Sequence, residues 1–133
     1  MGEQFRHRIR VRYNECDPQG HVFNANYLAY FDLAMTELWR GLGGHEAMVS
    51  DGVDMVVAEA RVRYLAPLGF DDEVELVVRS VRLGNTSITS ELAIERAGEP
   101  VAEGELRHVF VRPAQAQTAP VPDAVRAGLS RFA

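Results

Sequence analysis

Residues 5–13 alternate between two kinds of side chain. Arginines occupy positions 6, 8, 10 and 12, and the positions between them carry Phe5, His7, Ile9, Val11 and Tyr13. A period of two is typical of a β-strand with one buried face and one solvated face. The pattern therefore predicts a first strand over residues 5–13 with an arginine-rich outer face.

The period changes between Tyr27 and Arg40. Apolar residues recur there at spacings of three and four, which is typical of a helix, and they cover more than one narrow stripe. Asn24 or Asn26 can cap the start of this helix, and glycines at positions 41, 43 and 44 favour its end. Because the helix is apolar on most sides, we expect a large apolar surface to cover it.

The rest of the chain returns to a period of two and predicts four more strands. They are Val53–Leu65, Glu73–Leu83, Ser87–Glu95 and Val101–Arg112, joined by hairpin-scale turns. A loop over Gly43–Gly52 is expected to contain a short helical turn around His45–Val49. Residues 113–121 are predicted to form a polar linker and residues 122–131 a short C-terminal helix.

Alternation also predicts which side chains share a face. In the second strand the shared face is expected to carry Val56, Ala58, Ala60, Val62 and Tyr64. In the last strand, small residues at 102 and 104 lie on the same face as Leu106, His108 and Phe110 and would let the helix sit close. The order of elements predicts an α+β fold, in which an antiparallel sheet of about five strands wraps around one long central helix.

Composition narrows the class of protein. The 133 residues are 47% hydrophobic and 25% charged, which suits a single domain over residues 1–133 with one core. We expect a cytoplasmic protein, because no apolar run is long enough for a membrane helix and the N-terminus lacks the apolar region of a signal peptide. The net charge of -5 argues against a nucleic-acid partner.

Neither a disulfide nor a metal or cofactor is expected. Cys16 is the one cysteine, and the four histidines show no spacing typical of metal ligands. A sheet of this kind covers the helix on one side only, and its edge strands stay open. The sequence therefore predicts a homo-oligomer, with edge strands of two copies pairing into a continuous sheet.

The turn before the helix carries the candidate chemistry. It delivers Asp17 close to a helix N-terminus, where unpaired N–H groups and the dipole favour negative charge. An aspartate before Pro18 can also simply bond its own turn. Cys16 is a rival nucleophile without an identifiable base, and His21 can either orient a substrate or satisfy nearby carbonyls.

These residues resemble a known family. The pattern Tyr13-x-Glu15-x-Asp17-x-x-Gly20-His21-Val22-x-Asn24-Ala25-x-Tyr27, followed by Arg63-Tyr64-Leu65-Ala66-Pro67 and Phe70-Asp71-Asp72, is similar to the hot-dog-fold acyl-CoA thioesterases of the 4-hydroxybenzoyl-CoA thioesterase type. The similarity covers nearly the whole chain. Hot-dog proteins share this scaffold across several activities, so the resemblance indicates the family more sharply than the substrate.

The resemblance implies roles for individual residues. Asp17 matches the catalytic aspartate, and the residue whose backbone N–H polarises the thioester carbonyl matches Asn24. Relatives often carry tyrosine or histidine at that position, but the backbone role does not depend on the side chain. Substrate contacts are expected from Gly20, His21, Asn26 and Tyr27. Family active sites lie at a dimer interface, so a homodimer or a tetramer is expected.

The expected activity is hydrolysis of an acyl-CoA to free acid and CoA. Asp17 would act either as a nucleophile, through an anhydride, or as general base for water. Alternatives are a thioesterase for carrier-protein-bound acyl or polyketide chains, a hot-dog hydratase or dehydratase, and a non-catalytic acyl-CoA sensor. Tyrosines 27, 30 and 64 and Phe31 could line an acyl pocket, although core packing is their more common role.

Arginines on the strands are candidates for contacts with the phosphates of CoA. The positions concerned are Arg61, Arg63, Arg79, Arg82, Arg107 and Arg112. Each of them taken alone is more often a solvated strand arginine. The sequence leaves both interpretations open.

Overall fold

The computed structural model describes residues 2–48 and 52–133. In these ranges the strands form one antiparallel sheet of six strands in the order β1-β3-β4-β5-β2, with the short β6 beside β5. The strands are β1 (Phe5–Arg10), β2 (Asp54–Tyr64), β3 (Glu73–Leu83), β4 (Ser87–Arg96), β5 (Glu99–Arg112) and β6 (Gln117–Thr118). The helices are α1 (Ala25–Gly41), α2 (His45–Met48) and α3 (Asp123–Leu129), and 3-10 turns lie at Tyr13–Glu15, Pro113–Gln115 and Ser130–Phe132.

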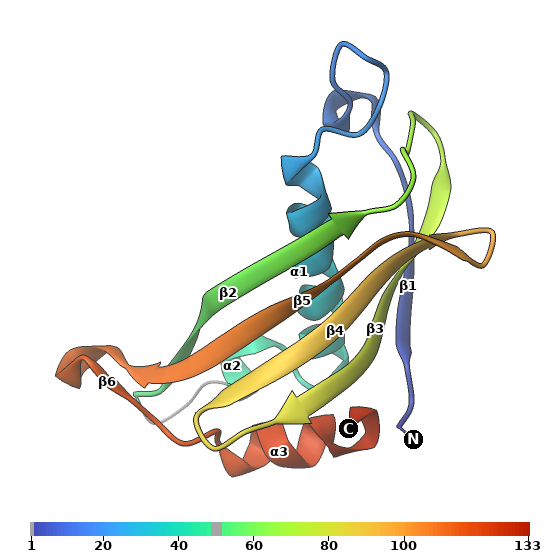
Figure 1. Cartoon of the computed structure of the whole chain (residues 1–133). Helices are drawn as coiled ribbons and strands as arrows, with labels where there is room; N and C mark the ends of the chain where they lie inside the picture. The colour runs from blue at the N-terminus through green and yellow to red at the C-terminus, as the bar shows by residue number, and fades with distance from the viewer. Residues whose placement is uncertain (1, 49–51) are drawn as a thin grey trace.

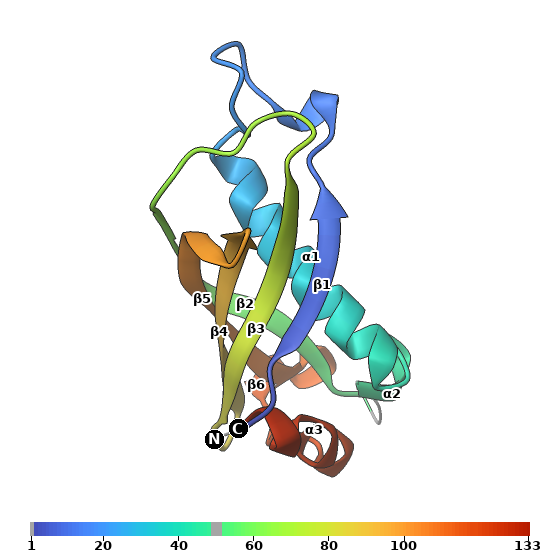
Figure 2. The same ribbon diagram turned by 90° about the vertical axis from the view of Figure 1, so that its right-hand side faces the viewer.

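The sheet curls around α1, which runs along its inner face (Figures 1 and 2). The core side of α1 consists of Tyr27, Tyr30, Phe31, Ala34, Met35, Leu38 and Trp39. These side chains pack against inward-facing residues of β3, β4 and β5 in one cluster. Full burial of a large apolar side chain contributes about 1.5–3 kcal/mol. The predicted wrapping of a sheet around one long apolar helix is confirmed.

The helix and β5 approach each other closely at Gly104. A Cβ atom at this position would lie 2.0 Å from the carbonyl oxygen of Arg61 on β2 and 2.7 Å from a ring carbon of Phe31 on α1. Only glycine leaves room for both neighbours. The prediction that small residues in the last strand let the helix sit close is therefore confirmed.

The first strand is shorter than predicted. β1 ends at Arg10, and Tyr13 begins a 3-10 turn with 79% of its side chain exposed. Val11 still exchanges backbone hydrogen bonds with residues 71 and 72. Beyond it, Glu15 N–H bonds to the carbonyl of Arg12 and turns the chain away from the sheet. The expectation that Tyr13 continues the buried face was wrong for this reason.

A β-bulge in β2 overturns part of the predicted face. The pairing of β2 with β5 shifts between Val57 and Glu59, so that Val57 lies opposite His108 while Ala60 lies opposite Leu106. His108 and Leu106 are both buried on the inner side of β5. The inner row of β2 is therefore completed by Val57 rather than by Val56 and Ala58, because the extra residue reverses the alternation.

The C-terminal segment is more ordered than a linker. Its 3-10 turn at Pro113–Gln115 leads into β6, where Thr118 pairs with Val111 of β5, and Ala119 and Val121 are buried. The predicted linker was wrong, because these small apolar residues pack into the core. The C-terminal helix is confirmed as α3, extended by a 3-10 turn.

Two smaller predictions concern the loop after α1. The helical turn there is confirmed as α2, which ends at Met48, while Val49 lies outside the described residues. Gly43 and Gly44 follow the end of α1 with φ of 108° and 87°, as expected of glycines at a helix C-terminus.

Within the described ranges, no helix combines the length and the apolar composition that crossing a bilayer requires.

Candidate active site

Asp17 lies in a tight turn that precedes α1. Its backbone N–H donates to the carbonyl of His21 at 2.8 Å, and the N–H of Gly20 donates back to the carbonyl of Asp17 at 2.9 Å. Gly20 adopts φ of 83°, a conformation that is easy for glycine. The Oδ1 atom of Asp17 accepts the N–H of Gln19 at 2.9 Å and that of His21 at 3.4 Å. The turn therefore engages one carboxylate oxygen and leaves Oδ2 outside these hydrogen bonds.

The loop that follows β2 holds this turn in place. His21 forms a β-bridge with Gly69, and the N–H of Val22 donates to the carbonyl of Leu68 at 2.8 Å. Val22 and Leu68 are both buried, so apolar contact accompanies the hydrogen bond. Asp72 accepts the N–H of Gly69 through Oδ2 at 2.9 Å and fixes the loop in turn.

The start of α1 lies beside the turn. Asn24 occupies the N-cap position but forms no side-chain cap, so the predicted capping role of its amide was wrong. Its carbonyl accepts a hydrogen bond from the Tyr64 hydroxyl at 2.9 Å. Among the described residues, the N–H of Asn24 makes no hydrogen bond. This N–H is one of the unpaired donors at the positive end of the helix dipole.

A cavity of about 400 Å³ joins these groups. The rings of Tyr27 and Tyr64 meet edge to face in its wall, with centroids 4.9 Å apart. Burial raises the pKa of Tyr27 above its ordinary value. The residues that line the cavity are Asp17, Gln19, His21, Val22, Phe23, Asn24, Tyr27, Tyr64, Leu65, Ala66 and Pro67. The cavity is therefore polar beside the Asp17 turn and apolar along its other wall.

The structure brings most of the predicted site residues to one place. Asp17, His21, Asn24 and Tyr27 line the cavity, while Gly20 shapes the turn without lining it. Asn26 does not line the cavity, and its side-chain amide instead donates to the backbone carbonyl of Glu15 at 2.9 Å. The roles of these six residues remain predictions.

Sequence reasoning missed part of the wall. Leu65, Ala66 and Pro67 follow β2 directly, and their signal in the sequence was their place in the family pattern, to which no role was assigned. Tyr64 was a candidate for lining a pocket and does so. Tyr30 and Phe31 were candidates too, but both are buried in the core and do not line the cavity.

The chain matches a known family over most of its length. The model of the thioesterase-like superfamily covers residues 11–129. The chain belongs to this superfamily. It is similar to the acyl-CoA thioester hydrolase YbgC of Escherichia coli O6:H1, with 30% identity over 123 residues, which are 91% of this chain and 92% of YbgC.

Solved structures give the same assignment. A gentisyl-coenzyme A thioesterase superposes with a TM-score of 0.81 at 26% identity, covering 93% of this chain and 98% of that one. A 1,4-dihydroxy-2-naphthoyl-CoA thioesterase from Synechocystis superposes with a TM-score of 0.88 over 96% of both chains. Its identity of 16% shows a shared fold alone. The predicted hot-dog fold and the resemblance to hot-dog acyl-CoA thioesterases are confirmed.

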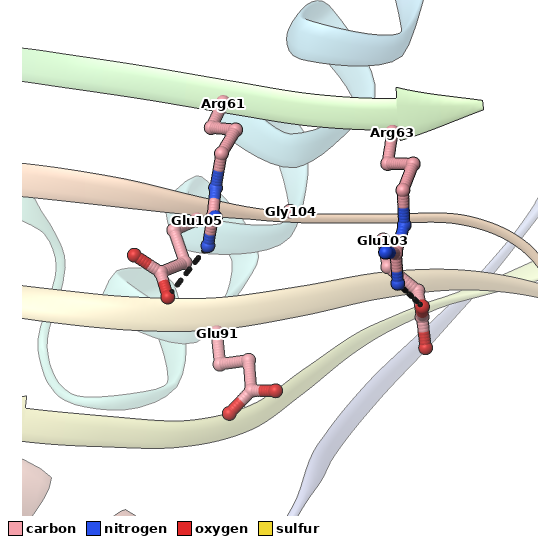
Figure 3. A pocket seen from close by; sticks show the side chains of 6 residues that line it. All are labelled: Arg61, Arg63, Glu91, Glu103, Gly104 and Glu105. Carbon is pink, nitrogen blue, oxygen red and sulfur yellow. Dashed lines mark hydrogen bonds and ion pairs between the residues drawn. The ribbon is translucent and has the colours of Figure 1, made fainter.

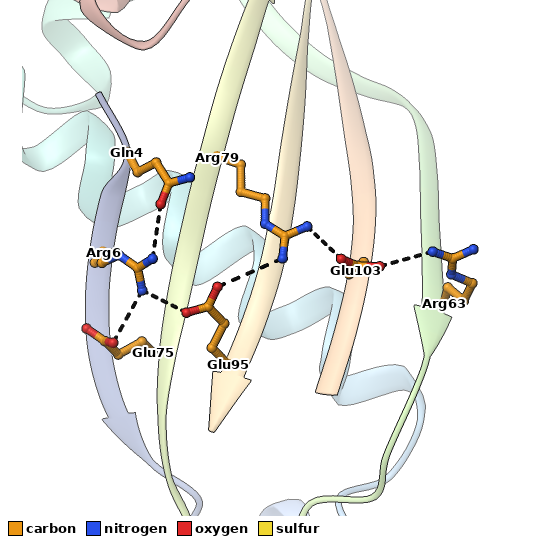
Figure 4. A network of polar contacts seen from close by, with 7 residues as sticks. All are labelled: Gln4, Arg6, Arg63, Glu75, Arg79, Glu95 and Glu103. Atoms are coloured by element: carbon orange, nitrogen blue, oxygen red, sulfur yellow. Dashed lines mark hydrogen bonds and ion pairs between the residues drawn. The ribbon is translucent and has the colours of Figure 1, made fainter. Parts of the chain in front are cut away.

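In this thioesterase-like protein, the strand arginines pair with glutamates on the outer face of the sheet. Arg79 bonds Glu103 at 2.6 Å, and Arg63 bonds the same carboxylate at 3.0 Å (Figure 4). Hydrogen bonds from Arg79 and then Arg63 lower the pKa of Glu103. The network continues through Glu95 to Arg6 at the other edge.

A second hollow, of about 190 Å³, lies on this outer face. Figure 3 shows Arg61 and Arg63 reaching from β2 toward Glu105 and Glu103 of β5 there, with the helix behind the strands. Both arginines of the hollow are already paired with these two glutamates, and the third glutamate, Glu91, accepts a hydrogen bond from the Ser80 hydroxyl. None of the six arginines considered for CoA phosphates is among the residues that line the Asp17 cavity.

Neither the rival nucleophile Cys16 nor the buried His108 is among the residues that line the Asp17 cavity. Cys16 is partly buried, with Sγ 3.8 Å from the carbonyl oxygen of Arg12. His108 is buried beneath α1, with its ring edge to face against Trp39, and burial lowers its pKa. Within residues 2–48 and 52–133, no three histidine, cysteine, aspartate or glutamate side chains gather as a metal site would need.

Proposed function

We propose that this protein hydrolyses acyl-CoA thioesters in the cavity beside the start of α1. The observation that carries the proposal is that one cavity is lined by both Asp17, which bears a carboxylate, and Asn24, whose N–H at the helix N-terminus is unpaired among the described residues. Thioester hydrolysis needs both an attacking group or base and a donor for the growing negative charge on the carbonyl oxygen. The names of the relatives, an acyl-CoA thioester hydrolase and a gentisyl-coenzyme A thioesterase, support the same activity.

The Asn24 N–H is proposed as the oxyanion donor. It lies at the N-cap of a 17-residue helix, so the dipole adds positive potential at the same point. The hydrogen bond from Tyr64 to the Asn24 carbonyl fixes the orientation of the residue. A donor held in this way needs no rearrangement as the charge develops.

Asp17 is proposed to act on the carbonyl carbon through Oδ2. As general base, it would take a proton from water while the water oxygen attacks the thioester carbon. The tetrahedral intermediate then expels CoA as a thiolate, which takes up a proton, and the acid is released. As nucleophile, Asp17 would displace CoA and form a mixed anhydride, which water hydrolyses to the same products. Both routes use the carboxylate oxygen that the turn leaves outside its hydrogen bonds.

The apolar wall is proposed to receive the acyl group. Tyr27, Tyr64 and Leu65 give it two aromatic rings and an aliphatic side chain next to the reacting groups. The volume of about 400 Å³ falls within the usual range for ligand pockets, roughly 300–1,000 Å³. An acyl group carried on a carrier protein presents the same thioester and is the closest variant of this substrate.

A homodimer is proposed to complete the cavity. β2 pairs with β5 on one side, and its other edge has no partner strand among the described residues. Part of this open edge is apolar, because Val56 and Val57 are each 48% exposed. Long, open apolar edges are sites of strand pairing. Tyr64 and Leu65 lie at the end of the same strand, so a second copy paired along β2 would border the cavity.

The dimer can be tested by placing charge on this edge. The double variant Val56→Lys and Val57→Lys sets like charges against each other across a two-fold axis, and we expect it to sediment as a monomer with lost thioesterase activity. The control carries Ala114→Lys and Gln115→Lys on an exposed 3-10 turn. Sedimentation at twice the chain mass is expected for the unmodified protein and the control. An unmodified protein that is monomeric and fully active would contradict the proposed dimer.

The activity itself is tested by free-thiol release from acetyl-, hexanoyl-, palmitoyl- and benzoyl-CoA. We expect at least one thioester to be hydrolysed with kcat/KM in the usual enzyme range, about 10⁴–10⁸ M⁻¹ s⁻¹. Crotonyl-CoA is included because loss of its double bond without thiol release would indicate a hydratase instead. Binding of these thioesters without any turnover would contradict the proposal and favour a sensor.

A further inference from the structure

Glu15 is a charged residue in a sheltered position. Its side chain is only 14% exposed, although it lies in a surface turn. Four donors reach its carboxylate. Oε1 accepts the backbone N–H of Arg12 at 2.8 Å and the Tyr30 hydroxyl at 2.9 Å, while Oε2 accepts Nε and Nη2 of Arg12 at 3.1 and 2.8 Å.

The backbone of Glu15 makes further links to the same region. Its carbonyl oxygen accepts the N–H of Phe23 at 2.9 Å and the side-chain amide of Asn26 at 2.9 Å. Asn26 and Tyr30 belong to the first two turns of α1, and Phe23 directly precedes the residue with the unpaired N–H. Glu15 is thus bonded to both sides of the loop that carries Asp17.

The carboxylate is ionised and satisfied. Burial alone would raise its pKa, but the hydrogen bonds from Arg12 and then Tyr30 outweigh burial, and the pKa of Glu15 falls below its ordinary value of 4.5. An ionised, multiply bonded carboxylate makes stronger hydrogen bonds than a neutral group. It is also absent from the residues that line the cavity, so it has no direct access to a substrate.

We infer that Glu15 is a positioning residue, which fixes the Asp17 turn to the first two turns of α1 and so holds the Asp17 carboxylate in register with the Asn24 N–H. The inference rests on the proposed function, since register matters only if these two groups act on one carbonyl. A misplacement of about 1 Å between reacting groups can cost on the order of 100-fold in rate. The expected effect of Glu15 therefore falls on turnover rather than on binding.

The test is Glu15→Gln, with Glu37→Gln as matched control. Glu37 bonds Arg40 three residues along the chain at 2.7 Å, and its side chain is 19% exposed, so its setting is close to that of the Glu15–Arg12 pair. It lies on α1 away from the cavity. Glutamine keeps the size of the side chain but turns an NH₂ group toward the donors of Arg12 or Tyr30.

We expect Glu15→Gln to lower kcat roughly 10- to 100-fold, while KM and the Kd of the inert thioether S-butyl-CoA stay within about twofold. Glu37→Gln should leave all three unchanged. A fall in kcat accompanied by an equal weakening of thioether binding, or equal losses in the two variants, would overturn the positioning role.

Two readouts do not depend on turnover. Amide exchange at Phe23, whose N–H bonds to Glu15, should speed up at least about tenfold in Glu15→Gln and stay unchanged in Glu37→Gln. Because the folded-state pKa of Glu15 is lowered, its carboxylate stabilises the fold above pH 4.5, and this stabilisation is lost as pH falls through the folded-state pKa. The difference in unfolding temperature between the unmodified protein and Glu15→Gln should shrink accordingly below pH 4.5.

These readouts separate the two ways in which the inference can fail. A protein that hydrolyses no thioester while Phe23 exchange responds to Glu15→Gln would leave the anchoring of the loop intact and reject the proposed function. A protein that hydrolyses thioesters but shows unchanged Phe23 exchange and kcat in Glu15→Gln would reject the positioning role alone.

Discussion

Asp17→Asn is expected to lower kcat for acyl-CoA hydrolysis at least roughly 100- to 10,000-fold, the contribution typical of a general base. The variant keeps an oxygen that can accept the N–H groups of Gln19 and His21, so the turn should fold as before. It loses the charge and the basicity that either route to hydrolysis requires. Stopped assays of thiol release with the preferred thioester measure the effect.

The same variant separates catalysis from a purely structural role in the turn. The unfolding temperature and the Kd for S-butyl-CoA should both stay close to those of the unmodified protein. Asp32→Asn, on the exposed side of α1, removes one charge elsewhere and should retain full activity. If Asp17→Asn hydrolyses thioesters at the unmodified rate, the carboxylate only holds the turn and the assignment of the site is wrong.

Gly104→Ala is expected to destabilise the fold by at least about 3 kcal/mol, the upper end for overpacked cores. The added Cβ would lie 2.0 Å from a backbone oxygen of β2, which no side-chain rotation can relieve. It would also push Phe31, and with it α1, away from the sheet. Thermal unfolding should show a drop on the order of 10 °C.

Gly41→Ala is the control for this substitution. It adds the same methyl group at the end of α1, where a Cβ would meet nothing within 4 Å. Its effect should remain below about 1 kcal/mol. Unfolding of Gly104→Ala at the same temperature as Gly41→Ala would show that the close approach of α1 to β5 does not exist in solution.

The sequence predicts the helices and strands of this fold better than the features that depend on distant residues. The periods of β3 and β4 and of α1 come from neighbouring residues, so those elements were found within one or two positions. The bulge near Ala58 depends on pairing with a strand some 50 residues later and leaves no local trace. The structure of residues 113–121 likewise depends on the burial of Ala119 and Val121 in a core that other elements build.

The same distinction holds for the candidate site. Asp17 and the helix N-terminus are close in sequence, and their proximity could be predicted from the turn between them. The wall formed by Leu65, Ala66 and Pro67 comes from a distant segment and needed the structure. Glu15 matched a family pattern but had no predicted role, because Tyr30, which bonds it, is 15 residues away.

Asp17 and the Asn24 N–H are proposed to act on one thioester carbonyl. A crystal structure with a ketone analogue of acetyl-CoA, in which a methylene group separates the carbonyl from sulfur, tests this proposal most directly. The predicted result places the ketone oxygen about 2.7–3.1 Å from the Asn24 nitrogen, with the ketone carbon facing Asp17 Oδ2. An analogue bound with its ketone away from both groups, or in the hollow on the outer face of the sheet, would contradict the account.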